Sequence, residues 1–206
     1  MSDPLPVHAA PCPPDLPDAF PRALRVDAQA LRSTDVWHPH PAHLHFIVVL
    51  ADEKLAIPTR LYFDTALLAA HGDLDARQRA MLWCLGTRHH NGQVREECLR
   101  HLLANLQDWM APFVIHLIGE YVHEIIRLID AALTTLDPHM QTAFARFARD
   151  NPRYIDTIEQ RTISYRPADY DRRSGRSRDY PGAHAMARLR RLVLAEHDAA
   201  RRAAST

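Results

Sequence analysis

The segment from Pro112 to Leu133 is the longest stretch of this 206-residue sequence in which apolar residues recur at helical spacing. Its apolar positions, from Phe113 to Ile129, would cover more than half of a helix circumference. Neighbouring elements must cover so apolar a helix, because exposing that surface to water is unfavourable. We therefore predict one continuous helix over 112–133, at the centre of a mainly α-helical domain.

The part of the chain before this helix differs in composition. Prolines are dense over residues 1–22 and predict an extended arm, because proline lacks an amide hydrogen and fixes its backbone. Residues 43–63 contain two short apolar runs separated by the polar turn Ala51–Lys54, which predicts a β-hairpin. Pro58 places the second strand at an edge or at a bulge.

Helix start signals follow the hairpin. Asp75 with Gln78 forms a capping-box pattern, and Asp137-Pro138 and Asn151-Pro152 each place a capping residue before proline. We predict an arm over 1–22 and a mainly helical core domain over 23–165, with the hairpin at 43–63. An Arg/Tyr-rich loop over 166–182 and a C-terminal helix over 183–206 complete the predicted organisation.

Residues 82–103, LWCLGTRHHNGQVREECLRHLL, resemble one helix pair of the HEAT-like repeat proteins. In that family a polar turn with glycine precedes the Val-Arg-Glu that opens the second helix; Asn91-Gly92 and Val94-Arg95-Glu96 match it here. The resemblance, with the following helix, covers about a quarter of the chain (residues 75–133). It implies an irregular helical bundle or short solenoid that carries one small hairpin, with surfaces for protein partners and no catalytic residues.

Charge and cysteine content indicate which partners and which cellular compartment to expect. The sequence has 25 basic and 25 acidic residues, so no net field draws it to nucleic acid or membrane. Lys54 is the only lysine, a usage typical of GC-rich bacterial genes. Cys12, Cys84 and Cys98 form no Cys-x-x-Cys motif, and the last two occupy apolar helical positions, which favours a reducing compartment. The sequence has no secretory signal pattern, and charges interrupt 112–133, so we expect a cytoplasmic protein without a membrane partner.

Two basic residues and two histidines cluster at the predicted interhelical turn. Arg88, His89, His90 and Arg95 would lie near the N-terminus of the helix that starts near Gln93. Such a helix end favours anionic groups, so these residues are candidates for contact with a partner's carboxylates. The alternative is an exposed polar turn without a binding role.

The narrow polar stripe of the central helix carries the second candidate site. His116, Glu120 and His123 are spaced to share one helix face, with Glu124 beside them. Glu120-x-x-His123 resembles half of a di-iron site, but no second Glu-x-x-His occurs. Arg127 occupies the second ligand position of a zincin-like pattern, and arginine does not bind zinc at neutral pH. We expect a structural or partner-facing stripe; a metal site at His116, Glu120 and His123 is the alternative.

The segment 165–180 interleaves tyrosines with arginines, including Tyr170, Arg172 and Arg173. Arginine with aromatic residues can bind single-stranded nucleic acid, whereas the intervening aspartates favour contact with a protein or with solvent. The sequence contains no P-loop, no Gly-x-Gly-x-x-Gly and no Gly-x-Ser-x-Gly motif.

We therefore predict a non-enzymatic protein-binding module of the immunity-protein, inhibitor or adaptor type, which acts through a helical surface and uses no cofactor. Its partner would be another protein, such as a toxin or effector, and the oligomeric state stays open. The alternatives are a metal-dependent hydrolase or oxidase, and a nucleic-acid-binding protein. The predicted partner-binding residues are Arg88, His89, His90, Arg95, Glu120, His123, Glu124, Tyr170, Arg172 and Arg173.

Overall fold

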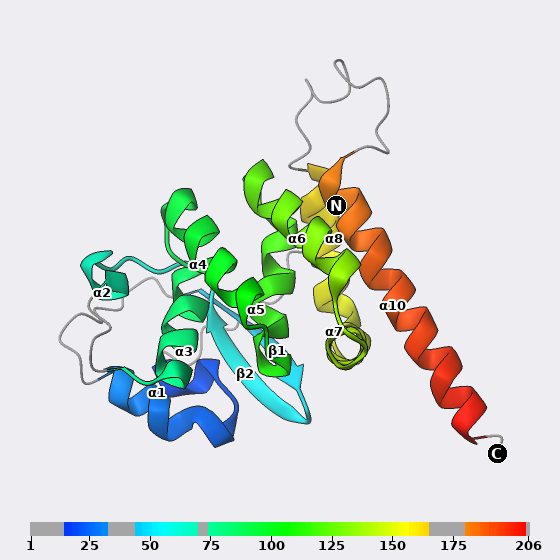
Figure 1. Ribbon diagram of the computed structural model, residues 1–206, viewed down its shortest axis with the longest axis horizontal. Helices are drawn as coiled ribbons and strands as arrows, with labels where there is room; N and C mark the ends of the chain where they lie inside the picture. The colour runs from blue at the N-terminus through cyan, green and yellow to red at the C-terminus, as the bar shows by residue number, and fades with distance from the viewer. Residues whose placement is uncertain (1–14, 33–43, 70–73, 165–179, 205–206) are drawn as a thin grey trace. The chain divides into compact units, whose positions relative to one another are not determined.

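The computed structural model describes residues 15–32, 44–69, 74–164 and 180–204 (Figure 1). These residues are mainly helical and include one two-stranded antiparallel hairpin, which confirms the predicted class. The HEAT-like pairing remains a resemblance. The chain divides into two compact units, residues 1–105 and 106–206, and the boundary falls inside the predicted core domain.

The N-terminal unit begins with two 3₁₀ turns and a short helix. The turn η1 starts with a capping box, in which Asp15 Oδ1 accepts from the Leu16 amide and the Asp15 amide donates to Asp18 Oδ2, both at 3.0 Å. Residues 16–19 are therefore helical, not extended as expected, because a proline is tolerated in the first turn of a helix. The elements of this unit are η1 (Leu16–Ala19), η2 (Arg22–Leu24), α1 (Arg25–Arg32), β1 (His45–Leu50), β2 (Glu53–Pro58), α2 (Ala66–Ala69), α3 (Ala76–Gly86) and α4 (Gly92–Ala104).

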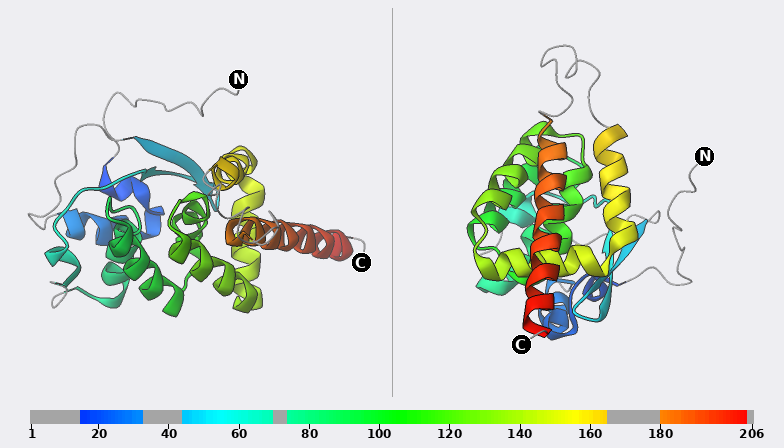
Figure 2. Two further views of the ribbon diagram at one scale, coloured as in Figure 1. Left: turned by 90° about the horizontal axis from the view of Figure 1, so that it is seen from above. Right: turned by 90° about the vertical axis from the view of Figure 1, so that its right-hand side faces the viewer.

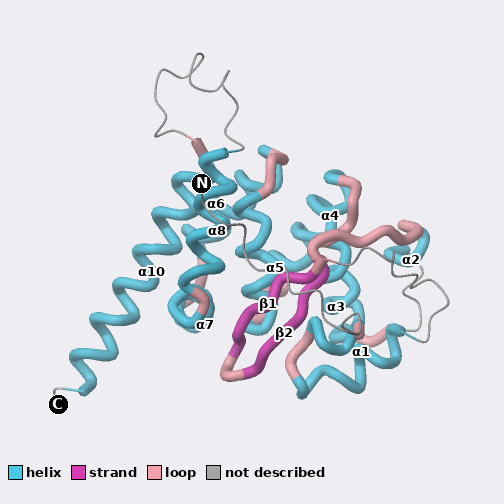
Figure 3. The backbone as a smooth tube through the Cα atoms, turned by 180° about the vertical axis from the view of Figure 1, so that it is seen from behind, coloured by secondary structure: helices cyan, strands magenta, loops and turns pink. Residues whose placement is uncertain are grey.

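The hairpin is closed by the two-residue turn Ala51-Asp52, whose φ angles are 49° and 66° (Figure 3). Positive φ at both positions matches the twist of the strands. His45 pairs with Pro58, and the Thr59 amide donates to Leu44 O at 2.8 Å in the next pair. Because bonded and non-bonded pairs alternate in an antiparallel hairpin, Pro58 lies at a non-bonded position, where its missing amide hydrogen costs the pairing nothing.

Helix α3 starts at the predicted capping box, and α4 starts at Gly92, one residue before the start predicted near Gln93. Asp75 Oδ1 accepts from the Arg77 and Gln78 amides, both at 2.8 Å, and Gln78 Oε1 accepts from the Asp75 amide at 3.2 Å. Asn91 Oδ1 caps α4 by accepting from the Gln93 amide at 2.9 Å. These caps satisfy amides that have no partner inside the helix, and they fix where the turn between the two helices lies.

The C-terminal unit contradicts the prediction of one continuous helix over 112–133. Helix α5 ends at His116, a 3₁₀ turn follows, and α6 begins only at His123. The elements of this unit are η3 (Asp108–Met110), α5 (Ala111–His116), η4 (Leu117–Gly119), α6 (His123–Thr135), α7 (Pro138–Asp150), α8 (Pro152–Ser164) and α10 (Pro181–Ala204).

Contacts with α8 lie at the break. The Thr162 hydroxyl lies 2.9 Å from Ile158 O of its own helix and 3.2 Å from Ile118 O, so its one hydrogen is shared between α8 and a carbonyl at the break. A Cβ on Gly119 would lie 3.3 Å from Ile158 O and from Arg161 Cβ, so only glycine allows α8 so close without some shift. The apolar periodicity of the segment continues through the break and conceals it.

The last helix, α10, packs against α6, α7 and α8 (Figure 2). Ala185, Met186 and Leu189 of this helix are buried in the core, together with Tyr180, which precedes the helix. Arg188 Nε donates to Asp130 Oδ1 at 2.8 Å, and Arg190 forms a short ion pair with Glu159. Among the described residues, no helix is both long enough and apolar enough to cross a bilayer.

Candidate partner-binding surfaces

The turn between α3 and α4 is bonded to the chain segment that follows β2. The Leu61 amide donates to Arg88 O at 2.8 Å, and the His90 amide donates to Leu61 O at 2.9 Å. Leu61 and His89 thereby form an isolated parallel bridge. Two segments far apart in the sequence, 61–63 and 87–91, are thus held side by side.

Two of the predicted partner-binding arginines lie inside this structure. Arg88 and Arg95 are both 0% exposed. Arg95 Nη1 donates to His89 O and to His90 O, each at 2.9 Å, and Arg88 Nη2 donates to Thr87 O. The exposed position expected for these arginines is therefore wrong: both lie beneath the surface, and Arg95 supports the turn from within. The sequence could not reveal this, because arginine is seldom fully buried.

His89 is buried in the same turn, and its hydrogen bonds define its protonation state. The Asn91 amide donates to His89 Nδ1 at 3.2 Å, so Nδ1 acts as the acceptor. His89 Nε2 lies 3.0 Å from Phe63 O and must carry the hydrogen that it donates there. Burial lowers the pKa of His89. The hydrogen bond to Phe63 O raises it, and the positive charge of His90, Arg95 and Arg60 lowers it, so the net shift of the pKa is downward. His89 is therefore a neutral structural residue.

His90 is the exposed member of the predicted cluster, and it contacts a tyrosine that the sequence analysis did not select. The rings of Tyr62 and His90 are stacked, with centroids 4.8 Å apart and planes at 14°. Tyr62 is 51% exposed. The sequence places Tyr62 in the second strand of the hairpin, but β2 ends at Pro58, and the bridge at Leu61 brings Tyr62 to the turn. Tyr62 and His90 are called the aromatic pair below.

The predicted stripe in the C-terminal unit is not a stripe, because the break in the helix separates its members. His116 and Glu120 are buried, whereas His123 is half-buried and packs edge-on against the Tyr180 ring. His116 Nδ1 lies 2.6 Å from the Tyr154 hydroxyl. The shared face on which the metal hypothesis depended does not form. Within the described ranges, no three His, Cys, Asp or Glu side chains are placed to hold a metal ion.

The remaining predicted contact residues fall in two places. Glu124 is exposed in the first turn of α6, where its charge is favourable toward the helix N-terminus. Tyr170, Arg172 and Arg173 lie outside the described residues, so the nucleic-acid alternative stays a prediction.

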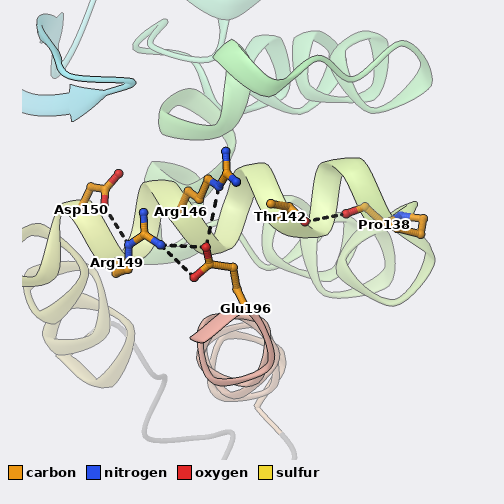
Figure 4. Close-up of polar contacts among 6 residues, drawn as sticks. All are labelled: Pro138, Thr142, Arg146, Arg149, Asp150 and Glu196. Atoms are coloured by element: carbon orange, nitrogen blue, oxygen red, sulfur yellow. Dashed lines mark hydrogen bonds and ion pairs between the residues drawn. The ribbon is translucent and has the colours of Figure 1, made fainter. Parts of the chain in front are cut away.

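A groove between α7 and α10 is a further feature, one that the sequence analysis did not anticipate. Arg149 Nη1 donates to both carboxylate oxygens of Glu196, at 2.7 and 2.9 Å, and Arg146 Nε lies 3.7 Å from Glu196 Oε1 (Figure 4). These ion pairs join the two helices. The groove has a volume of about 440 Å³. It is lined by Pro138, Gln141, Thr142, Arg146, Leu192, Ala195, Glu196, Ala199, Ala200 and Ala203.

Comparisons with known proteins add no relative. The chain matched no protein-family model, no curated protein and no solved structure.

Proposed function

We propose that this protein is a non-enzymatic binding module that recognises another protein through the aromatic pair, Tyr62 and His90. The observation that carries the proposal is the stacking of these two exposed rings, whose centroids are 4.8 Å apart. They lie on a turn that the buried side chains of His89 and Arg95 support by hydrogen bonds. Tyrosine is enriched among the residues that contribute most to protein interfaces, because it offers apolar area together with a hydroxyl.

The hydrogen bonds beneath the aromatic pair support this assignment. Arg95 bonds two carbonyls of the turn, and His89 bonds Phe63 O and the Asn91 amide. The two rings therefore sit on a backbone that does not need to become ordered when a partner binds. Ordering a mobile side chain costs about 0.5–1.5 kcal/mol on binding, so a pre-formed pair is favourable for affinity.

The surroundings of the aromatic pair favour a partner with carboxylates near an apolar patch. Arg60 Nη1 lies 3.4 Å from His89 O, which places a guanidinium beside the turn. The Tyr62 ring supplies apolar area, and His90 supplies a ring nitrogen at the surface. An acidic protein, such as a toxin that an immunity protein neutralises or an effector held by an adaptor, matches this chemistry.

We place the protein in the cytoplasm. Cys84 and Cys98 are free thiols in the core of the N-terminal unit, and buried free thiols are suited to a reducing compartment.

Affinity capture from a lysate of the source organism tests the proposal with three tagged proteins: the wild type, Tyr62→Ala/His90→Ala, and Tyr121→Ala. Tyr121 is 59% exposed in the other unit and gives a matched control for removal of a surface tyrosine. We expect a protein that the wild type and Tyr121→Ala retain and the double variant loses. Equal recovery by all three would contradict the proposal, provided that circular dichroism shows each to be folded.

A further inference from the structure

The side chain of His89 joins the two chain segments that carry the aromatic pair. It is 2% exposed, its Nε2 donates to Phe63 O at 3.0 Å, and its Nδ1 accepts from the Asn91 amide at 3.2 Å. The ring therefore connects the segment after β2 to the residue that caps α4. Only the neutral ring can make both bonds, because a charged imidazole carries a hydrogen on each nitrogen.

The groups around His89 oppose a positive charge on its ring. The side chains whose charge acts on it are Arg60 from the segment after β2, His90 from the turn and Arg95 from α4. Within the described residues, no acidic side chain is among them. Arg88, which precedes His89, donates to a backbone carbonyl. Burial and the positive charge outweigh the hydrogen bond at Nε2, so the pKa of His89 lies below its ordinary value of 6.5.

The aromatic pair depends on the same turn, because Tyr62 and His90 stack where the turn holds their two segments side by side. The bonds that hold the segments are those from the Leu61 amide to Arg88 O and from the His90 amide to Leu61 O. A proton on His89 Nδ1 would face the amide hydrogen that this atom now accepts, and two donors cannot bond each other. We propose that acid opens this turn: protonation of His89 releases its ring, the turn leaves Leu61, and the aromatic pair separates.

The opening is local, because the packing of the N-terminal unit does not depend on this ring. Helices α3 and α4 pack against each other, and Met81, Leu85, Cys98 and Leu99 are buried in them. These side chains carry no charge near neutral pH, so acid leaves their contacts in place. Segments that are held mainly by hydrogen bonds open at a lower free energy than a packed core does.

Acid favours the open turn because the open turn binds a proton more readily than the closed one. In the open turn His89 is hydrated and its pKa returns toward 6.5, whereas the closed turn binds the proton only at lower pH. One proton is taken up on opening, so the ratio of open to closed turn rises about tenfold for each pH unit between these two values. For its consequence the inference rests on the proposed function: the partner is bound at neutral pH and released in acid.

Amide hydrogen exchange of the full chain, between about pH 7 and pH 5, measures the opening without a partner. After correction for the intrinsic pH dependence of exchange, the protection of the Leu61 and His90 amides should fall about tenfold per pH unit. The Leu99 amide, in the core of α4, should stay better protected at every pH. Equal protection of all three amides would overturn the inference, because acid would then unfold the whole unit.

Two variants identify the titrating group. His89→Gln takes up no proton, so the protection of the Leu61 and His90 amides should no longer depend on pH. His90→Gln is the matched control, since it removes the neighbouring exposed histidine and should keep the wild-type dependence at Leu61. If His89→Gln does not fold, the ¹⁵N shifts of the wild-type His89 ring replace it, and protonation must coincide with the loss of protection. A ring that stays neutral while protection falls would overturn the inference.

Crosslinking in cell extract, from a photoreactive phenylalanine analogue at position 62, tests the consequence for binding. A partner crosslinked at about pH 7 should be lost at about pH 5 from the wild type and retained by His89→Gln. Equal crosslinking at both pH values, while exchange shows an open turn, would overturn the control of binding. Absence of any partner at pH 7 would instead refute the proposed function, and hydrogen exchange alone then decides whether acid opens the turn.

Discussion

The Nδ1 atom of His116 and the hydroxyl oxygen of Tyr154 lie 2.6 Å apart in the interior of the C-terminal unit. The contact joins the end of α5 to α8, at the level where the predicted central helix breaks. Tyr154 also packs edge-on against Phe147 of α7, with ring centroids 6.1 Å apart. Three helices therefore meet at one buried polar contact.

Replacing Tyr154 with phenylalanine removes only the hydroxyl of this contact. We expect a loss of about 1–2 kcal/mol in the free energy of unfolding, because a buried polar partner of His116 disappears. Urea unfolding measures the change. Tyr121→Phe is the matched control, since that exposed tyrosine should change stability by less than about 0.5 kcal/mol. Equal stability of Tyr154→Phe and wild type would show that the contact contributes nothing.

The lowered pKa of His89 predicts a pH dependence of stability. The unfolded chain binds the proton near the ordinary value of 6.5, and the folded protein binds it only at lower pH. The unfolded state therefore holds more protons at acidic pH, and stability falls as the pH drops below about 6.5. The free energy of unfolding, measured between about pH 7 and pH 5, should fall more steeply with decreasing pH for the wild type than for His89→Gln. If the free energy of unfolding changes equally with pH in both proteins, His89 is not a neutral, buried residue.

Gly86 and Cys98 form a close contact between α3 and α4. A Cβ at position 86 would collide with Cys98 Sγ, so Gly86→Ala should destabilise the protein by about 1–3 kcal/mol, although alanine favours a helix. In a Cys98→Ala background the same substitution should cost less than about 1 kcal/mol, because the sulfur is absent. A cost that does not depend on residue 98 would refute the contact.

The two core thiols should react slowly while the protein is folded. Burial raises the pKa of Cys98 to about 12 and that of Cys84 well above its ordinary range. Because the thiolate is the reactive form, few molecules can attack a disulfide reagent near neutral pH. In a Cys12→Ser background, release of chromophore from such a reagent should be slow for native protein and fast in denaturant. Rapid reaction of both thiols in the native state would contradict their burial.

Much of the fold could be predicted because its signals are local. The capping box of Asp75 and Gln78 and the N-cap of Asp137 involve residues within three positions of each other, and both form as expected. The hairpin also follows from two short apolar runs and the polar turn between them. Such features depend on residues that are close in the sequence, so they can be recognised in a single sequence.

The helix break and the aromatic pair could not be predicted, because they involve contacts between segments that are distant in the sequence. The break after His116 lies where Thr162 contacts Ile118 O and where α8 closely approaches Gly119. The aromatic pair requires Tyr62 and His90, 28 positions apart, to be joined by the bridge at Leu61. Neither relationship leaves a periodic signal, so apolar spacing alone predicts a straight helix and an isolated turn.

Site-specific photo-crosslinking in living cells tests the central claim most directly. A photoreactive phenylalanine analogue replaces Tyr62 in one protein and Tyr121 in another, and crosslinked products are identified by mass spectrometry. The proposed function predicts one discrete heterologous protein crosslinked from position 62 and absent from position 121. If position 62 gives no product, or both positions give the same products, the aromatic pair is not a site of protein recognition.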